Sequence, residues 1–270
     1  MTVARRRLFD DRASLLEEVR RVAVCAGDAI VALAAGDRCA VWNKADDSPV
    51  TQADLAANAI IVESLSALDA RTPIVTEEAP REPGALPARF WLVDPLDGTR
   101  EFVAGSNEYT VNVALIEDGL PVLGVVCAPA LGVTYLAARG SGAYRRDAAG
   151  TQPIHARVDG PLVLVASRSH AGSSLAAFVA ALPPHTLVEL GSSLKLCLVA
   201  DGTAQLYPRL GATCWWDTAA AHAVVLEASA QVTALDGTPL RYDGDGMLNP
   251  PFVCSSLPLA TWSAAARAAG

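Results

Sequence analysis

The chain has 270 residues, of which 51% are hydrophobic and 19% charged, and its mean hydropathy is +0.29. This composition excludes a mostly disordered polypeptide, and the length suits one large α/β unit or two coupled subdomains. The formal net charge of −8 argues against a basic face that neutralises nucleic-acid phosphates, although a small phosphorylated ligand is compatible where cations reverse the local field.

Apolar side chains at helical spacing predict two helices near the N-terminus. The first covers residues 14–35 and ends at Gly36, and the second covers residues 51–68 with Thr51 as its N-cap. The polar stretch between them is expected to be a loop or an irregular hairpin. Strand patterns follow at residues 73–76, 90–94, 110–116, 123–128 and 134–138. Glycine turns between the last three strands predict an antiparallel meander.

The polar segment 145–160, which contains glycine and proline, is the best candidate for a boundary within the chain. We therefore expect an N-terminal α+β subdomain of residues 1–150 and a C-terminal α/β subdomain of residues 151–270. In the second part, strands and helices alternate, which favours layered α/β packing. The strands are expected at residues 162–167 and 204–207, and the helices at 173–182, 194–200 and 217–229.

Cysteine, histidine and membrane signals narrow the class of protein further. The six cysteines show neither zinc nor redox spacing, and most have apolar neighbours, so buried reduced thiols are expected. Because the four histidines are scattered, any metal site should consist of oxygen ligands. The longest apolar runs are too short to span a bilayer, and no apolar segment follows the arginines at residues 5–7. We expect a cytoplasmic protein, with peripheral contact at the inner membrane left open.

The most informative segment is residues 91–101, in which an apolar strand ends in DPLDGT. Asp94 closes the strand, Pro95 interrupts its hydrogen bonding, and Gly98 and Thr99 open a helix. This arrangement directs two carboxylates and two backbone N–H groups at one place, which suits an anionic phosphate. An Asx-turn that caps a helix would explain Asp97 alone, but not the four residues together.

Other acidic residues occupy similar positions at the ends of predicted elements. Glu77 and Glu78 follow a short apolar strand, Asp54 lies on the first turn of the second helix, and Asp217 precedes an alanine-rich run. Each has an ordinary structural explanation when it is considered alone: a solvated turn for Glu77 and Glu78, a helix-dipole partner for Asp54 and an N-cap for Asp217.

Together these segments resemble the inositol monophosphatase family of metal-dependent, lithium-sensitive phosphatases. Residues 94–99, the pair Glu77-Glu78 and residues 216–220 (WDTAA) carry the resemblance. Further segments are similar to the bacterial 3′(2′),5′-bisphosphate nucleotidase branch: residues 44–54 (KADDSPVTQAD), 167–170 (SRSH), 191–195 (GSSLK) and 207–209 (YPR). The resemblance covers nearly the whole chain and implies the layered αβαβα sandwich of this family and of fructose-1,6-bisphosphatase.

The resemblance also implies a set of roles. The Mg²⁺ ligands, for two or three ions, would be Glu77, Asp94, the Leu96 carbonyl, Asp97 and Asp217. Water would attack the phosphate directly, oriented or deprotonated by Glu77, Thr99 and Asp54, without a covalent phospho-enzyme. The substrate would contact the metal-side residues Glu77, Leu96, Asp97, Gly98, Thr99 and Asp217, and its 5′-phosphate would contact Ser192, Lys195 and Arg209.

The implied reaction is removal of the 3′-phosphate from adenosine 3′,5′-bisphosphate to leave AMP, a step of sulfur metabolism, with the sulfated precursor as a second substrate. An inositol or histidinol monophosphatase with the same metal core is the nearest alternative, and a non-catalytic Mg²⁺-dependent nucleotide-binding regulator is another. Lys195 and Arg209 could instead be ordinary surface cations, and His170 could contact the base or be structural. The expected partner is a small molecule rather than nucleic acid, and both a monomer and a homodimer remain open.

Overall fold

Two β-sheets form the framework of the computed structural model, which describes residues 11–36, 40–43, 49–79, 86–168, 172–244 and 246–269. Seven strands form the first sheet, in chain order: β3 (Ile74–Thr76), β4 (Arg89–Asp97), β5 (Thr110–Glu117), β6 (Leu120–Ala128), β7 (Val133–Ala138), β8 (Gly142–Asp147) and β9 (Gly150–Ile154). The second sheet has the order β11-β10-β12-β14-β13, with β10 (Leu162–Ser167), β11 (His185–Leu190), β12 (Leu206–Arg209), β13 (Gln231–Ala234) and β14 (Phe252–Ser255).

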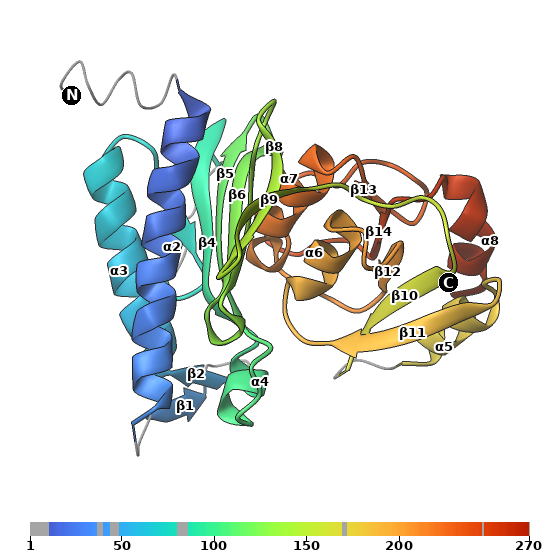
Figure 1. Cartoon of the computed structure of the whole chain (residues 1–270), viewed down its shortest axis with the longest axis horizontal. Helices are drawn as coiled ribbons and strands as arrows, with labels where there is room; N and C mark the ends of the chain where they lie inside the picture. The colour runs from blue at the N-terminus through green and yellow to red at the C-terminus, as the bar shows by residue number, and fades with distance from the viewer. Residues whose placement is uncertain are drawn as a thin grey trace.

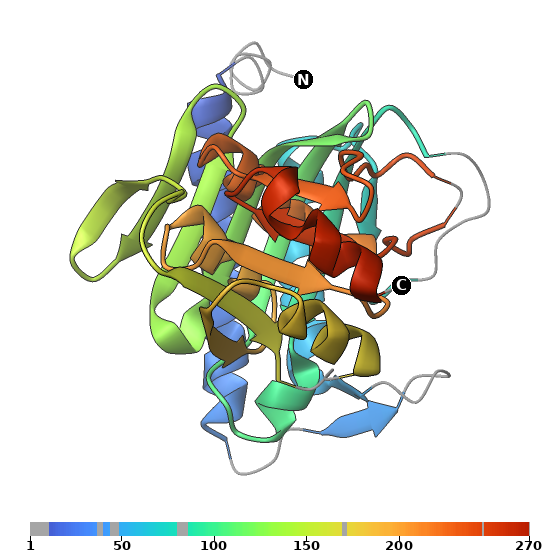
Figure 2. The ribbon, with the colours of Figure 1, turned by 90° about the vertical axis from the view of Figure 1, so that its right-hand side faces the viewer.

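Helices cover both faces of each sheet and so give five layers (Figure 1). The helices are α2 (Arg12–Ala34), α3 (Gln52–Leu68), α4 (Thr99–Val103), α5 (Ser173–Ala180), α6 (Leu194–Ala200), α7 (Ala219–Glu227) and α8 (Leu259–Ala269). The first two cover the outer face of the first sheet, α6 and α7 lie between the sheets, and α5 and α8 cover the second sheet on the outside (Figures 1 and 2). The predicted αβαβα sandwich is therefore confirmed.

The two N-terminal helices form where apolar spacing predicted them. The α2 helix begins after Asp11, whose side chain accepts a hydrogen bond from the Ala13 N–H group at 3.2 Å. The α3 helix begins with a capping box, in which Thr51 and Asp54 bond to each other's backbone N–H groups. Thr51 is thus the predicted N-cap. The stretch between the helices contributes a short ribbon of β1 (Val41–Asn43) and β2 (Pro49–Thr51).

The first sheet shows the predicted meander, since β4 to β9 pair with their chain neighbours in antiparallel order. Only β3 runs parallel to β4. Much of the segment 145–160, the candidate boundary, lies in the edge hairpin of β8 and β9. Its polar residues fit there, since an edge hairpin is solvated on most sides. Sheet membership changes only after Ile154, and the division at residue 150 stays a prediction.

Several elements of the second half were not predicted or begin at other residues. The strands β13 and β14 have four residues each and β11 is partly exposed along its length, so none of the three gave a clear pattern, and the helix α8 was not predicted. Asp217 is not the N-cap of the following helix as expected. It ends the short 3-10 helix η2 (Trp215–Asp217) and accepts a hydrogen bond from the Cys214 N–H group at 2.8 Å, while Thr218 caps α7.

The thiol prediction holds for most of the described cysteines. Cys127, Cys197 and Cys254 are buried, free thiols, and Cys214 is half-buried. Cys25 differs, because it lies on the exposed side of α2. None of the described helices is long and apolar enough to cross a membrane. The predictions for Arg5 to Arg7, for residues 44–48 and for His170 concern residues outside the described part of the chain.

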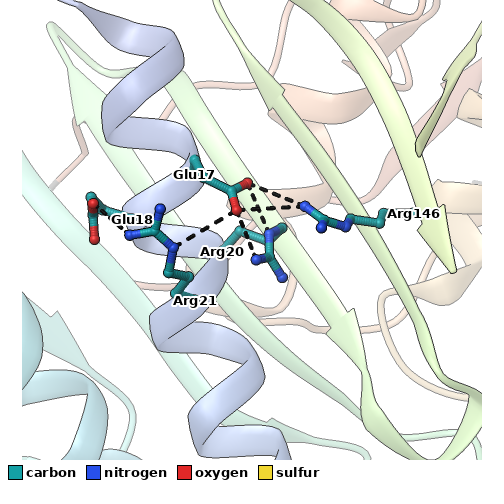
Figure 3. Close-up of polar contacts among 5 residues, drawn as sticks. All are labelled: Glu17, Glu18, Arg20, Arg21 and Arg146. Carbon is teal, nitrogen blue, oxygen red and sulfur yellow. Dashed lines mark hydrogen bonds and ion pairs between the residues drawn. The ribbon is translucent and has the colours of Figure 1, made fainter. Parts of the chain in front are cut away.

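An ion-pair cluster on the surface connects α2 with β8 (Figure 3). Glu17 pairs with Arg20 at 2.8 Å, and Arg146 reaches across from β8 to Glu17 at 3.4 Å. Water screens such partly exposed pairs, so each stabilises the fold by at most about 1 kcal/mol. The layers are held mainly by the apolar contacts between sheets and helices rather than by this cluster.

Close contact between α7 and the first sheet depends on Gly124 in β6. A Cβ atom at this position would lie 2.1 Å from the Ala220 carbonyl oxygen, which is far inside van der Waals contact. Glycine therefore lets the helix approach the strand directly. This approach matters for the site described below, because α7 follows directly on the segment that carries Asp217.

We expect Gly124→Ala to lower the free energy of unfolding by about 1–3 kcal/mol, because the added methyl group forces α7 away from β6. Urea denaturation measures this loss. The matched control is Gly211→Ala, where nothing lies within 4 Å of the added Cβ atom. We expect the control to change stability by less than about 0.5 kcal/mol. Equal stability of the two variants would contradict the packing argument.

Candidate metal centre and substrate cleft

An open cleft of about 340 Å³ lies where the two sheets approach each other. Its walls come from both sheets and from segments that are more than a hundred residues apart in the chain. Of the predicted site residues, ten line the cleft: Glu77, Asp94, Leu96, Asp97, Gly98, Thr99, Ser192, Lys195, Arg209 and Asp217. Asp54 does not line it directly but contacts Thr99.

Three acidic residues converge at one end of the cleft. Carboxylate oxygens of Glu77, Asp94 and Asp217 all lie within 4.8 Å of one another. The first two are neighbours because β3 and β4 run parallel with Thr76 opposite Val93, so that Glu77, directly after β3, lies beside Asp94. Asp94 does not close its strand as expected, because β4 continues to Asp97 and pairs there with Thr110. Asp217 comes from η2, between the second sheet and α7.

The negative charges of these acids are unfavourable unless a cation lies nearby. Burial, followed by the nearby charge of Glu77, raises the pKa of Asp94 well above its ordinary value. Burial, together with the charge of Asp97, raises the pKa of Asp217 to about 8. Converging carboxylates repel one another unless a positive charge lies between them. An all-oxygen donor set of this kind fits a hard divalent ion such as Mg²⁺.

Asp97 lies in the same cleft but has a different immediate partner. Its Oδ2 atom accepts a hydrogen bond from the Ser193 N–H group at 2.5 Å, and it is not one of the three acids that converge within 4.8 Å. Burial raises its pKa, although the Lys195 charge and the Ser193 N–H group act in the opposite direction. Asp97 therefore lies between the acidic end of the cleft and the basic end.

The chain path through DPLDGT explains how these groups reach the cleft. The β4–β5 pairing is irregular between Asp94 and Asp97, where Pro95 has no N–H group to donate. Asp94 accepts a hydrogen bond from the Leu96 N–H group at 3.0 Å and so forms an Asx-turn. The alternative of an Asx-turn in which Asp97 caps the helix is wrong, because Gly98 is the N-cap of α4 and no side chain caps it. Gly98, with φ of 91°, then reverses the chain into α4.

A hydroxyl–carboxylate pair connects the DPLDGT turn to α3. The Thr99 Oγ1 atom lies 3.1 Å from Asp54 Oδ1 and 3.1 Å from the Leu96 carbonyl oxygen. Because the hydroxyl has one hydrogen, it donates to one acceptor at a time, and its lone pairs remain able to accept. The other oxygen of Asp54 is fixed by the N–H and hydroxyl groups of Thr51 at 2.8 and 2.6 Å.

The same cleft carries two cations that are not surface residues, and their part of the cleft is called its basic end here. Lys195 is 6% exposed and Arg209 is 8% exposed. The alternative that both are ordinary surface cations is therefore wrong. Burial lowers the pKa of Lys195 to about 8, although the Asp97 charge opposes this shift. Its ammonium group donates to the Ser192 carbonyl at 2.5 Å.

Two buried polar atoms at this end have no hydrogen-bond partner within the described part of the chain. They are Ser192 Oγ and Arg209 Nε. The Arg209 Nη2 group does donate to the Ala212 carbonyl at 2.8 Å. Since buried polar atoms in folded proteins are nearly always paired, unpaired donors that line a cleft indicate a site for an anionic ligand.

Residues that the sequence analysis missed connect the two ends. The Ser193 hydroxyl donates to Asn112 Oδ1 at 2.8 Å, and, with its one hydrogen used there, it accepts from the Thr110 hydroxyl at 2.9 Å. Both partners lie on β5 of the first sheet, whereas Ser193 precedes α6. A polar Asn112 within the apolar run Val111 to Val113 was a usable signal, because an inward-facing amide on a buried strand needs a partner.

The fold and this site define a class of protein. A model of the inositol monophosphatase family matches residues 12–268, and the chain belongs to this family. Among its relatives, the 3′(2′),5′-bisphosphate nucleotidase CysQ of Escherichia coli K12 is 46% identical over 242 residues, which cover 88% of this chain and 98% of that protein. The CysQ protein of Buchnera aphidicola is 39% identical and covers 90% of this chain and 94% of its own length.

Solved structures agree with this family. The crystal structure of CysQ from Bacteroides thetaiotaomicron matches with a TM-score of 0.79 and 32% identity, covering 90% of this chain and 97% of that chain. An inositol monophosphatase from Anabaena has a TM-score of 0.76 and covers 95% of both chains, but at 23% identity it shows the shared fold alone.

We expect Asp217→Asn to stabilise the metal-free protein increasingly as the pH rises. The raised pKa means that, between about pH 4 and pH 8, the folded chain binds a proton that the unfolded chain has lost, so stability falls with rising pH. Removing the carboxyl group removes this loss. From pH 5 to pH 8.5 in EDTA, the stability of the variant relative to wild type should rise by at least about 1 kcal/mol, measured by urea denaturation.

The matched control for this experiment is Glu17→Gln in the surface cluster. A hydrogen bond from Arg20 lowers the pKa of Glu17 below 4.5, so its ionisation does not change over the same pH range. The control should show no trend with pH. A constant difference between Asp217→Asn and wild type over this range would contradict the electrostatic account of the acidic cluster.

Proposed function

We propose that this protein is a metal-dependent 3′(2′),5′-bisphosphate nucleotidase, which hydrolyses the 3′-phosphate of adenosine 3′,5′-bisphosphate to leave AMP. One observation carries the proposal: a single cleft has an acidic metal-type cluster at one end and two buried cations at the other. A substrate with two phosphates matches both ends, whereas an inositol monophosphate has no second phosphate for Lys195 and Arg209. The names of the CysQ relatives agree with this activity.

The acidic end would hold the metal. Mg²⁺, in two or three ions, is the cofactor that we propose for the oxygen ligands of Glu77, Asp94, Leu96, Asp97 and Asp217. When bound, such an ion supplies a positive charge that stabilises phosphate oxygens and makes a nearby water more acidic. The residues of the chain itself then position the substrate and take the proton.

Thr99 and Asp54 would act together on the attacking water. With its hydrogen donated to Asp54, the Thr99 hydroxyl presents lone pairs toward the cleft and can accept a hydrogen bond from water. As the water attacks, its proton would pass to the Thr99 hydroxyl while the hydroxyl hydrogen passes to Asp54. Glu77 would orient the same water. The backbone at Gly98 and Thr99, where α4 begins, would donate to the phosphate oxygens.

The basic end would select the substrate. Ser192, Lys195 and Arg209 would bind the 5′-phosphate, which would supply the acceptors that the Ser192 hydroxyl and the Arg209 Nε group lack among the described residues. A phosphate would also favour the charged form of Lys195, which burial disfavours. The sulfated precursor, which has the same 3′-phosphate, would be a second substrate. A cytoplasmic location completes the proposal.

The decisive experiment compares phosphate release from adenosine 3′,5′-bisphosphate and from inositol 1-phosphate in the presence of Mg²⁺. We expect kcat/KM to be at least about 100-fold higher for the bisphosphate, because only this substrate engages both ends of the cleft. Preference for the inositol ester, or for histidinol phosphate in the same assay, would instead favour those monophosphatase activities.

The variant Asp94→Asn tests whether the chain is an enzyme at all. Removing this buried metal-side carboxylate should lower kcat by at least about 100-fold, whereas the fold should persist because a buried charge is removed. Thermal denaturation checks the fold. Equally slow phosphate release by wild type and variant would favour a non-catalytic nucleotide-binding regulator.

We also expect Thr99→Val and Asp54→Asn to lower kcat by about 10²–10⁴-fold with little change in KM, because both would remove proton transfer without removing a phosphate ligand. Steady-state kinetics at saturating Mg²⁺ measure the effect. The double variant should be hardly worse than either single variant, since the two residues act as one unit. Additive losses would show that they act independently.

A further inference from the structure

The turn of residues 191–193 is held at both ends by carboxylates from the other half of the molecule. The Gly191 N–H group donates to Glu108 Oε2 at 2.8 Å, and the Ser193 N–H group donates to Asp97 Oδ2 at 2.5 Å. Asp97 ends β4 and Glu108 lies in the loop that leads into β5, so both come from the part of the chain that forms the first sheet, whereas the turn follows β11 of the second. The position of the turn is therefore set from across the cleft.

Between these two attachments, Ser192 has a strained backbone. Its φ angle is 48°, in the left-handed region that side chains other than glycine rarely adopt. Such a conformation persists only where the surroundings impose it. The carbonyl group of this residue accepts the Lys195 ammonium group, and its hydroxyl is the unpaired buried donor described above. The conformation of Ser192 therefore determines how both groups face the cleft.

Glu108 has a second partner that fixes its orientation. Its Oε1 atom accepts a hydrogen bond from Arg168 Nη2 at 2.8 Å, and Arg168 also donates to the Glu189 carbonyl at 3.2 Å. The backbone of Glu108 is also closely packed. A Cβ atom added at Gly98 or at Gly191 would lie only 3.0 Å from the Glu108 carbonyl oxygen. Glu108 thus packs against the DPLDGT turn and the 191–193 turn at once.

We propose that Glu108 is a positioning residue for recognition of the second phosphate: its carboxylate, oriented by Arg168, holds the 191–193 turn so that Ser192 and Lys195 face the substrate. The inference rests on the proposed nucleotidase function. Glu108 is not one of the residues that line the cleft, so it acts through the turn and does not touch the substrate. Removing it should impair binding of the 5′-phosphate while the chemistry at the 3′-phosphate continues.

The test is Glu108→Gln, assayed with adenosine 3′,5′-bisphosphate and with adenosine 3′-monophosphate, which lacks the 5′-phosphate. The amide keeps the shape of the side chain but cannot accept from Gly191 and Arg168 together, since its nitrogen is a donor. We expect KM for the bisphosphate to rise about tenfold with kcat within about twofold. For the 3′-monophosphate, kcat/KM should change by less than about twofold.

Two further variants calibrate this result. Arg209→Gln, which acts on the 5′-phosphate directly, should give the same substrate-selective loss. Glu17→Gln, which removes a comparable ion-paired glutamate on the far surface, should leave both substrates unchanged (Figure 3). If Glu108→Gln fails to fold in thermal denaturation, Arg168→Gln breaks the same contact from its exposed side and should show the same selectivity with a smaller rise in KM.

The outcomes separate this inference from the proposed function. An equal loss on both substrates, or no loss on either, would overturn the role of Glu108 while wild type still prefers the bisphosphate. A wild type that hydrolyses both nucleotides with equal efficiency would overturn the 5′-phosphate site itself, and the role of Glu108 with it.

Discussion

Repulsion among converging carboxylates is the constraint on which the rest of this structure depends. Glu77, Asp94 and Asp217 meet within 4.8 Å, and burial makes the negative charges of Asp94 and Asp217 costly. Apolar packing between the layers holds the acids together against this repulsion. A bound cation would resolve this conflict, and the same cation would reverse the local field of this acidic chain in favour of an anionic ligand. The cost in stability thus falls at the place where the proposed cation would bind.

The cleft works as one site because polar contacts connect its two halves. Asp97 interacts with both halves. Its negative charge helps to raise the pKa of Asp217, and its Oδ2 atom accepts a hydrogen bond from the Ser193 N–H group. Ser193 in turn bonds to Thr110 and Asn112 on the first sheet. The cations of the second half are therefore placed at a fixed distance from the acids of the first. In the proposed function, this placement would let the cleft distinguish a substrate with two phosphates from one with a single phosphate.

The parts of the site that could be predicted are those set by local rules. Apolar periodicity predicted α2 and α3, and proline and glycine predicted the turn after β4. The segments that escaped prediction obey no local rule. The β8–β9 hairpin is polar because it lies at a sheet edge, and β11 is half-exposed along its length, so neither shows a clear apolar pattern. The unusual backbone of Ser192 also depends on contacts across the cleft.

The sequence by itself determined which chemical groups are present: hard oxygen ligands after short apolar strands, a turn that exposes backbone N–H groups, and a few cations in an acidic chain. Family resemblance added the order of these groups along the fold. Only the tertiary structure decided that Lys195 and Arg209 are buried, that Thr99 contacts Asp54 across 45 residues, and that Glu108 holds a turn 83 residues away. The physical reason is that hydrogen bonds and charge interactions act over a few ångströms in space, whereas sequence patterns report only on neighbours along the chain.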